Sequence, residues 1–453
     1  IRPIRLPTGL SKICGSREES SLKMINGLGI YDTYDERGIE MRKILIALIS
    51  IGILVSWQIC QSDLATAAGN IDIMTMNQYL GADLDPIVEA ENPIELNEAV
   101  VTALEEVAAN DFPSRAVALA EIITDRLSEL VGLQEAFIFT CTDLELPSPD
   151  EGCDNPRIRN AFNDHLQLTL DAIAAKDEEY FAVATVVNFN TLGVVVPPVP
   201  LPGIPFLIDG HQALANIVDS DVILARGDIA EGAEVVDYTA FQPFGICLKD
   251  SADGCNYQVV GTATLPDGSV LSIERGFVGV DITVDGTDYR FVDTHLEVQE
   301  PDGTELSAII QAAQAQELID TLGATTPPDK SLIVVGDINS SPDDPIIIVP
   351  EPLPPGFPPV IVPPYTQLVE AGYTDAWTLR RGNKPGYSCC QLKDLSNHQS
   401  VLDERVDVIF SFDVPNRVKK ARVLGTRVSD KTQPPGQGLW PSDHGSVAAD
   451  LRF

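Results

Sequence analysis

The hydrophobic and polar positions of the chain follow two periods after residue 70. Short β-branched and apolar runs predict strands, whereas apolar residues at helical spacing predict amphipathic helices. The expected strands are 71–77, 130–134, 180–188, 221–226, 257–264, 276–284, 289–294 and 332–336. The expected helices are 91–110, 114–130, 158–176 and 304–322. Strands alternate with helices early in the chain and follow one another in the middle, which predicts an α/β sandwich with mixed sheets.

Two proline-rich and nearly chargeless segments interrupt this pattern, at 194–208 and 346–364. Proline lacks the amide hydrogen that a central strand or a helix interior needs, so we expect insertions that form extended loops or edge hairpins. Both segments either pack against the body of the protein or expose an apolar surface that contacts a membrane or a partner. Of these alternatives we favour packing.

The first 67 residues have the features of a segment that precedes an exported domain. A basic start at 41–43 leads into the apolar run 44–59, and Ala65-Thr66-Ala67 follows. This order is typical of a secretory signal peptide, so we expect residues 41–67 to be removed and the product to be secreted or periplasmic. A membrane anchor is the alternative, but the run is shorter than the ~20 residues of a span. Residues 1–40 are then interpreted as upstream non-native translation, and 68–453 as one domain.

The chain is strongly acidic, with 30 Lys and Arg against 67 Asp and Glu and a formal net charge of −37. All of this imbalance lies after residue 67, where 22 Lys and Arg face 60 Asp and Glu. A protein that coats nucleic acid neutralises phosphates with basic side chains, so the composition excludes a general coating protein. A local basic cleft is compatible with it.

Six cysteines follow residue 67, and four of them form two pairs that are close in sequence. Because an exported chain meets an oxidising environment, we expect each pair to be a disulfide. A zinc site is the alternative, but no C-x-x-C or paired histidine spacing supports it. The adjacent cysteines at 389 and 390 either form a vicinal bridge or stay reduced. The two expected disulfides are Cys141 with Cys153 and Cys247 with Cys255.

Polar residues of the types that bind metals and phosphates stand at the ends of several predicted strands. Each alone is weak evidence, because such residues are common in turns, but their order along the chain is a stronger observation. Strand ends of a sandwich meet at one edge, so we expect one cleft. Carboxylates such as Glu135 and Asp443 suit Mg²⁺ or Mn²⁺, and imidazoles with a further carboxylate suit attack of water on phosphorus. The strand-end residues are Asn77, Glu135, His295, Asp337, Asn339, Asp407, Asp443 and His444.

Seven segments resemble, in the same order, the endonuclease/exonuclease/phosphatase superfamily, which has the fold of the pancreatic-type deoxyribonucleases. They extend over residues 71–453 and read MTMNQYLGADL, LVGLQE, DSDVILAR, FVDTHLE, IVVGDINSSP, ERVDVIF and PSDHGSV. The resemblance implies a four-layered α/β sandwich of two packed mixed sheets flanked by helices. It also implies a metal-dependent attack of water on a phosphate ester.

The resemblance further implies a role for each residue that matches a motif. Glu135 would be the principal metal ligand, and Asn77 and Asp443 would complete the shell of that metal. Asp337 and Asn339 would orient the attacking water and bind the scissile phosphate.

The histidines and arginines receive the remaining roles. His444, held by Asp407, would act as acid/base or hold the phosphate, and His295 would contact a phosphate oxygen. Arg226 and Arg275 are the cationic candidates for binding a substrate phosphate, and a surface or structural ion pair is the alternative for both.

The expected function is an exported, Mg²⁺- or Mn²⁺-dependent phosphodiesterase that works as a monomer on a phosphate ester. The substrate is open between a nucleic acid, a phospholipid or sphingomyelin headgroup and a small soluble phosphoester. Scarcity of basic residues counts against a nuclease, whereas the proline-rich segments would suit peripheral membrane contact by a lipid phosphodiesterase. A catalytically silent binding protein of the same fold ranks below these, because all the expected types of site residue are present.

Overall fold

The computed structural model describes residues 69–453 except 192–194, 197–198, 201–202, 267, 269, 300–304, 350–357 and 435–437. The predicted upstream segment and signal peptide, residues 1–67, lie outside the described residues, as do parts of both proline-rich segments. No helix in the described part of the chain is long and apolar enough to cross a membrane.

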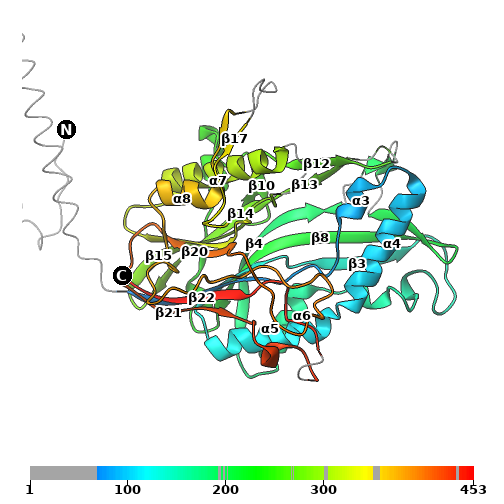
Figure 1. The fold of residues 1–453 in the computed structure, drawn as a ribbon, viewed down its shortest axis with the longest axis horizontal. Coiled ribbons are helices and arrows are strands. Elements are labelled where there is room, and N and C mark those ends of the chain that lie inside the picture. The colour runs from blue at the N-terminus through cyan, green and yellow to red at the C-terminus, as the bar shows by residue number, and fades with distance from the viewer. Residues whose placement is uncertain are drawn as a thin grey trace, which may run out of the picture. The chain divides into compact units, whose positions relative to one another are not determined.

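Two mixed sheets of eight strands each form the centre of the fold (Figure 1). The strands of the first sheet are β1 (Asn70–Asn77), β2 (Leu130–Gln134), β3 (Ile138–Asp143), β4 (Tyr180–Asn190), β7 (Ile204–Ile208), β8 (His211–Arg226), β21 (Arg417–Leu424) and β22 (Ser446–Arg452). They run in the order β21-β22-β1-β2-β8-β3, and β4 and β7 also pair with β8. The strand β21 therefore lies at an edge.

The second sheet runs through the middle of the sequence. Its strands are β9 (Glu234–Val235), β10 (Lys249–Ser251), β11 (Gly254–Asn256), β14 (Gly276–Val284), β15 (Thr287–His295), β16 (Ser331–Asp337), β19 (Thr374–Asp375) and β20 (Asp407–Ser411). Their order is β10-β11-β14-β15-β16-β20-β19, with β9 paired to β14. Three small hairpins complete the described strands: β5 (Val195–Val196) with β6 (Val199–Pro200), β12 (Gly261–Thr264) with β13 (Val270–Ile273), and β17 (Ile347–Ile348) with β18 (Val360–Ile361).

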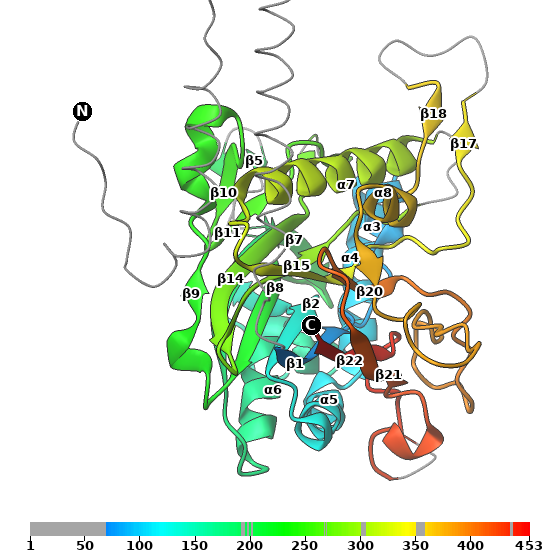
Figure 2. The same ribbon diagram turned by 90° about the vertical axis from the view of Figure 1, so that its left-hand side faces the viewer.

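Helices cover the outer faces of the two sheets (Figure 2). The helices are α3 (Asp85–Glu89), α4 (Pro93–Ala109), α5 (Phe112–Arg126), α6 (His165–Ala174), α7 (Leu306–Thr325) and α8 (Pro364–Glu370). Leu119 of α5 packs in one core cluster with Val131 of β2, on the outer face of the first sheet. Leu318 of α7 packs with Val334 of β16, on the outer face of the second sheet. This layering confirms the predicted four-layered sandwich.

Strand β1 shows why the sequence folds into this sandwich. Ile73 lies in the core between the two sheets, whereas the next residue, Met74, packs beneath α5. Successive side chains of a strand point to opposite faces, so a strand covered on both faces needs an unbroken apolar run. The sequence IDIMTM has nearly such a run, and its residues 73–76 are fully buried.

Several predicted elements differ from the structure. The helix expected over 158–176 begins only at His165, where the Asp164 side chain accepts a hydrogen bond from the Gln167 amide. The strand expected at 257–264 begins at Gly261, and the one expected at 221–226 is the last part of β8. The strands β3 and β21 were not predicted, because IFTCTD and RVKKARVL contain no long apolar run and many polar or charged residues.

The described part of the first proline-rich segment packs against the body of the protein, whereas the described part of the second packs against it only in part. Ile204 and Phe206 of β7 are buried in a core cluster with α4 residues, and β7 pairs with the long strand β8. In the β17–β18 hairpin, Ile361 packs against Ala308 of α7, but Ile348 is 77% exposed. The first segment thus forms an edge strand that packs against the body, which is the favoured one of the two alternatives.

The cysteines pair as the sequence predicts. The Cα atoms are 5.8 Å apart in the disulfide between Cys141 and Cys153 and 5.5 Å apart in the one between Cys247 and Cys255. The sulfur atoms of the adjacent cysteines at 389 and 390 also lie within bonding distance.

Candidate active site

Strand ends from both sheets meet at one edge of the sandwich. In the first sheet, β1 ends at Asn77, and its parallel neighbour β2 ends one residue before Glu135. In the second sheet, parallel pairing places His295 at the end of β15 beside Asp337 at the end of β16. The antiparallel strand β20 begins at Asp407, opposite Asp337. These five predicted residues therefore share one edge.

The side-chain amide of Asn77 joins the two sheets. Its Nδ2 donates to Oε1 of Glu135 at 3.0 Å and to Oδ2 of Asp337 at 3.1 Å. Its Oδ1 accepts a hydrogen bond from the backbone amide of Tyr79 at 2.9 Å. The other carboxylate oxygen of Glu135 accepts from the amide of Leu80 at 2.7 Å. In this arrangement Asn77 turns its nitrogen toward the carboxylates, although a metal ligand would have to offer its oxygen.

Two site residues adopt a left-handed backbone conformation. Glu135 has φ 57° and Asn339 has φ 46°. This conformation costs about 1–2 kcal/mol for a residue with a side chain, so it persists only where surrounding contacts hold it. The amide of Asn339 donates to Oδ1 of Asp337 at 2.9 Å, and the amide of Ala136 donates to the carbonyl of Ser220 at 3.0 Å. Strained residues of this kind gather at functional sites.

His444 forms a pair with Asp407. Its Nδ1 lies 2.8 Å from Oδ2 of Asp407. Its Nε2 faces two other carboxylates, at 3.7 Å from Asp337 and 4.0 Å from Asp443. Burial alone would lower the pKa of His444, but the three surrounding carboxylates raise it well above its usual value. The surrounding carboxylates therefore favour the protonated imidazole.

His295 occupies the opposite electrostatic environment. Nη1 of Arg275 lies 3.0 Å from its Nδ1, and Nδ2 of Asn339 lies 3.1 Å from its Nε2. Burial and the Arg275 charge hold the pKa of His295 well below its usual value. Arginine can only donate and the amide nitrogen of Asn339 also donates, so both ring nitrogens of His295 face hydrogen-bond donors. The Nε2 atom of His295 also lies 3.7 Å from Oδ2 of Asp337.

Arg275 lies among site residues, as predicted, and its partners include one that sequence reasoning missed. The guanidinium of Arg275 is 3.9 Å from Oδ2 of Asp219 and 3.9 Å from Oε1 of Glu297. Burial raises the pKa of Asp219 to about 7. Asp219 is the first residue of the DSDVILAR motif, so its place in a motif was the signal that could have identified it.

The structure corrects the expectation for Arg226. This residue ends β8, and β8 runs antiparallel to β2, so its end lies at the edge opposite to Glu135. There Arg226 pairs with Asp228 at 2.7 Å and with Glu129 at 3.6 Å. Arg226 therefore forms a surface ion pair at the edge of the sheet opposite to the strand-end residues.

A buried arginine, Arg115, was also missed and holds the site loops together. It lies in α5 and donates to the carbonyl oxygens of Gln78, Tyr79 and Pro441 at distances from 2.7 to 3.1 Å. These carbonyls belong to the loop after β1 and the loop that carries Asp443. Nothing in the sequence around Arg115 distinguishes it from an ordinary helix residue.

The donor set and its charge fit a divalent cation. Burial raises the pKa of Glu135, Asp337 and Asp443, and neighbouring carboxylates raise each of them further. Such mutual repulsion in a buried centre is relieved by a cation with oxygen ligands. Among the described residues, ligand atoms of Asp337, Asp407 and His444 also lie within 4.8 Å of one another.

Known proteins resemble this chain in fold rather than in sequence. No protein-family model matches it, and no curated protein matches it by sequence. An endonuclease/exonuclease/phosphatase family protein from Bacteroides thetaiotaomicron is similar with 14% identity, 85% of this chain and 99% of that chain covered, and a TM-score of 0.44. A mannosyl-6-phosphatase from the same organism is similar with 15% identity, 84% and 100% coverage and a TM-score of 0.42.

Truncated TDP2 from Caenorhabditis elegans gives 13% identity, 85% and 98% coverage and a TM-score of 0.41. These likenesses describe the fold, and we base the functional proposal on the side chains of this chain.

Proposed function

We propose that the chain is an exported, divalent-metal-dependent phosphodiesterase that hydrolyses a phosphate ester by attack of water. The observation that carries the proposal is the convergence of predicted residues from both sheets. Asn77 bonds to Glu135 and Asp337, and Asp337 in turn lies 3.7 Å from both His295 and His444.

Glu135 and Asp443 are the residues that would hold the cation, together with Asn77 if its amide turns over. All offer oxygen atoms, which Mg²⁺ and Mn²⁺ prefer. When bound there, the cation supplies positive charge that offsets the charge developing on the phosphate. The raised pKa values of Glu135 and Asp443 express the repulsion that such a cation would relieve.

Asp337 is the residue placed to orient the attacking water. Its Oδ1 accepts from the amide of Asn339, while its Oδ2 accepts from Asn77 and lies 3.7 Å from Nε2 of both histidines. A carboxylate in that position can accept a hydrogen bond from water and draw its oxygen toward phosphorus. The Asn339 side chain lies next to it and can donate to a phosphate oxygen.

The two histidines would have different roles in the reaction. His444, held protonated by Asp407, can donate a proton to the leaving oxygen or a hydrogen bond to the phosphate. Neutral His295 can donate its one ring hydrogen to a non-bridging phosphate oxygen. The Asp407 side chain fixes the orientation of the His444 ring.

Export and the monomeric state belong to the same proposal. The basic, apolar and small-residue segments of 41–67 support secretion, and so do the two disulfides, which persist in oxidising compartments. Peptide mapping of the secreted product would test the expected cleavage after Ala67.

A substrate panel tests the activity. The full chain is incubated with a chromogenic phosphodiester, the matching phosphomonoester, single-stranded DNA and sphingomyelin vesicles, each with Mg²⁺ and with EDTA. We expect hydrolysis of the small diester with Mg²⁺ and none with EDTA. Hydrolysis of the monoester alone would replace the diesterase by a phosphatase. Diester hydrolysis that persists in EDTA would overturn the metal dependence.

A further inference from the structure

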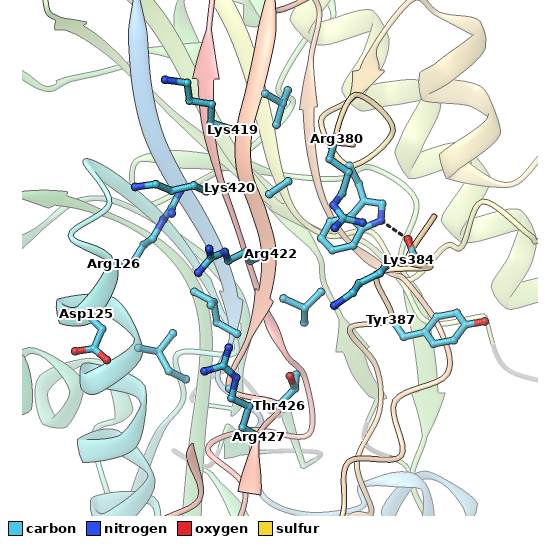
Figure 3. Close-up of a pocket in the computed structure, with 18 of the residues that line it drawn as sticks. Asp125, Arg126, Arg380, Lys384, Tyr387, Lys419, Lys420, Arg422, Thr426 and Arg427 are labelled. Carbon is cyan, nitrogen blue, oxygen red and sulfur yellow. Dashed lines mark hydrogen bonds between the residues drawn. The ribbon is translucent and has the colours of Figure 1, made fainter. Parts of the chain in front are cut away.

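A large groove lies at the edge of the first sheet (Figure 3). Its floor is the edge strand β21, one side is α5, and the other side is the loop 377–387. The groove has a volume of about 1800 Å³. None of the strand-end residues assigned to the active site lines it.

The groove collects basic side chains in a protein that has few of them. Nine of the 22 Lys and Arg after residue 67 line it, against three acidic residues. Four of the nine belong to β21, namely Arg417, Lys419, Lys420 and Arg422. Figure 3 shows the last three of these beside Arg126 of α5, with Arg380 and Lys384 of the loop across the groove. A basic surface within a chain of net charge −37 is the opposite of what random placement would give.

The basic side chains of the groove are almost all unpaired. Among the described residues, Arg126 alone of the nine forms an ion pair, with Asp72 at 2.7 Å. Partial desolvation and the nearby charges of Arg452 and Arg417 lower the pKa of the Lys419 ammonium. Cations that crowd one another while most carboxylates lie elsewhere leave an attractive field for an anion.

Protection of a sheet edge accounts for only part of this charge. Lysines on an edge strand prevent pairing with other chains, and a β-bulge between Lys419 and Arg422 also disrupts the edge. That role does not extend to the loop residues Arg380, Arg381 and Lys384, which face the same groove from outside the sheet. Side chains from separate elements that converge on one groove indicate a ligand.

Aromatic rings line the loop side of the groove. Tyr387 is 41% exposed, and Figure 3 shows it beside the groove. The guanidinium of Arg380 stacks over Trp377 at 4.4 Å, and the indole nitrogen of Trp377 donates to the carbonyl of Lys384 at 3.0 Å. These contacts hold the loop in place. Exposed aromatic rings next to unpaired cations are the combination that binds unpaired nucleobases and their phosphates.

One end of the groove lies next to the candidate active site. The carbonyl of Ser388, one residue after Tyr387, accepts a hydrogen bond at 2.7 Å from the amide of Gly445, the residue after His444. A Cβ placed on Gly445 would lie 2.5 Å from Val423 of the groove. The eight residues of β21 extend about 25 Å from there, at ~3.3 Å per residue. This length spans several phosphates of one strand.

We propose that the groove binds the phosphate backbone of a single-stranded nucleic acid. Tyr387 would stack on an unpaired base, and the cations of β21 and of the loop would contact successive phosphates. The proposal deepens the proposed phosphodiesterase, because a strand held here would lie next to His444. A basic groove explains how so acidic a chain could hold a polyanion. The reacting phosphate would lie among the carboxylates of the candidate site.

The test is a binding measurement that does not depend on hydrolysis. The full chain carrying Glu135→Gln is titrated against a fluorescent 20-nucleotide deoxythymidine strand in EDTA, at several salt concentrations. The variant K419Q/K420Q/R422Q should weaken binding at least about tenfold and make the slope of log K against log salt shallower by about 2, at ~0.7 for each lost contact. The loop variant R381Q/K384Q should weaken binding as well.

The matched control changes the net charge equally on another surface. R157Q/R159Q/K249Q removes three cations that lie outside the groove and form ion pairs with Glu105, Asp150 and Glu274. It should leave both affinity and salt slope unchanged. The thermal unfolding midpoint of each variant shows whether it is folded. If K419Q/K420Q/R422Q does not fold, the loop variant R381Q/K384Q still decides the test. Tyr387→Ala should weaken binding about tenfold, whereas Tyr387→Phe should not.

Four results would overturn the proposal: equal weakening by both triple variants, no binding of the strand by the parent chain, tighter binding of a duplex of equal length, or binding of phosphatidylserine vesicles in place of the strand. Because the assay contains EDTA and Glu135→Gln, failure of groove binding is distinct from failure of the proposed hydrolysis.

Discussion

Three buried carboxylates at the candidate site carry more negative charge than the neighbouring side chains neutralise. The neighbouring carboxylates raise the pKa of His444 well above its usual value, whereas burial and the Arg275 charge lower the pKa of His295. The two histidines are thus chemically different although both lie 3.7 Å from the same carboxylate oxygen. Environment separates their roles, as it does for paired acids in other hydrolytic sites.

The histidines provide the first prediction at this scale. His444→Ala should lower kcat by about 10²–10⁴-fold, because it removes the proton donor that Asp407 orients. His295→Ala should lower kcat by a smaller factor. His211, which pairs on the surface with Glu151, serves as the control, and His211→Ala should leave kcat unchanged. Steady-state kinetics on the chromogenic diester measure all three, and equal loss in the His444 and His211 variants would contradict the assignment.

Asp219 provides a prediction about pH. The folded chain keeps its proton up to about pH 7, whereas the unfolded chain releases it near the ordinary value of 3.8. Stability from this group is therefore fully present below the unfolded pKa and is lost as pH rises through the folded pKa. The side chain of Asp219→Asn is neutral at every pH and keeps this stability. The Tm of the variant minus the Tm of the parent should therefore grow between about pH 4 and pH 7 and then level off.

Thermal unfolding in EDTA across this pH range measures the effect. A gain in Tm that shrinks as pH rises would show that Asp219 is stabilised as a carboxylate by Arg275.

At the scale of elements, strand direction decides which residues reach the site. The parallel pairs β1–β2 and β15–β16 end at one edge, so the polar residues after their apolar runs could be predicted from the sequence. Arg226 was misplaced because β8 is antiparallel, and direction is not visible in a single apolar run. The strand β21 and its groove were not predicted, because RVKKARVL has the composition of a charged surface segment.

Backbone geometry at one glycine supports this arrangement. Gly336 has φ 146°, and a Cβ placed there would overlap the carbonyl of Thr294 on β15. Only glycine therefore lets β16 approach β15 just before Asp337. The sequence motif GDIN shows the glycine, but its packing partner could be identified only from the structure.

The two proline-rich segments give a prediction at the scale of elements. Phe206 of β7 is 3% exposed and lies in the core with α4, so Phe206→Ala should cost roughly 3–5 kcal/mol of stability. Ile348 of β17 is 77% exposed, and Ile348→Ala should change stability by no more than about 0.5 kcal/mol. Denaturant unfolding compares the two, and similar small losses would show that β7 does not pack as a core strand.

At the scale of the whole molecule, charge is divided between two surfaces. The candidate site gathers buried carboxylates, while the groove beside it gathers nine of the 22 basic residues that follow residue 67. Composition alone predicted the acidity and allowed a local basic cleft, but its location depends on side chains from three separate elements. Long-range placement of this kind is decided by tertiary packing rather than by local pattern.

The concentration of carboxylates predicts that divalent cations stabilise the folded chain. A cation that binds only the folded state at 100 times its Kd adds about 2.7 kcal/mol. The Tm of the parent should therefore rise with Mg²⁺ concentration, and the Tm of Glu135→Gln should rise much less. Equal increases for both would indicate that Mg²⁺ acts elsewhere on this acidic surface.

The most direct test compares the same chemical change at the two ends of β2. Glu135 follows the strand at the candidate site, whereas Glu129 precedes it and accepts a hydrogen bond from the amide of Asp72. Hydrolysis of the chromogenic phosphodiester is measured against Mg²⁺ concentration for the parent, Glu135→Gln and Glu129→Gln. We expect Glu135→Gln to lose orders of magnitude in kcat, with partial recovery at high Mg²⁺, and Glu129→Gln to retain the parent rate. An unchanged rate in Glu135→Gln would contradict the assignment of this site.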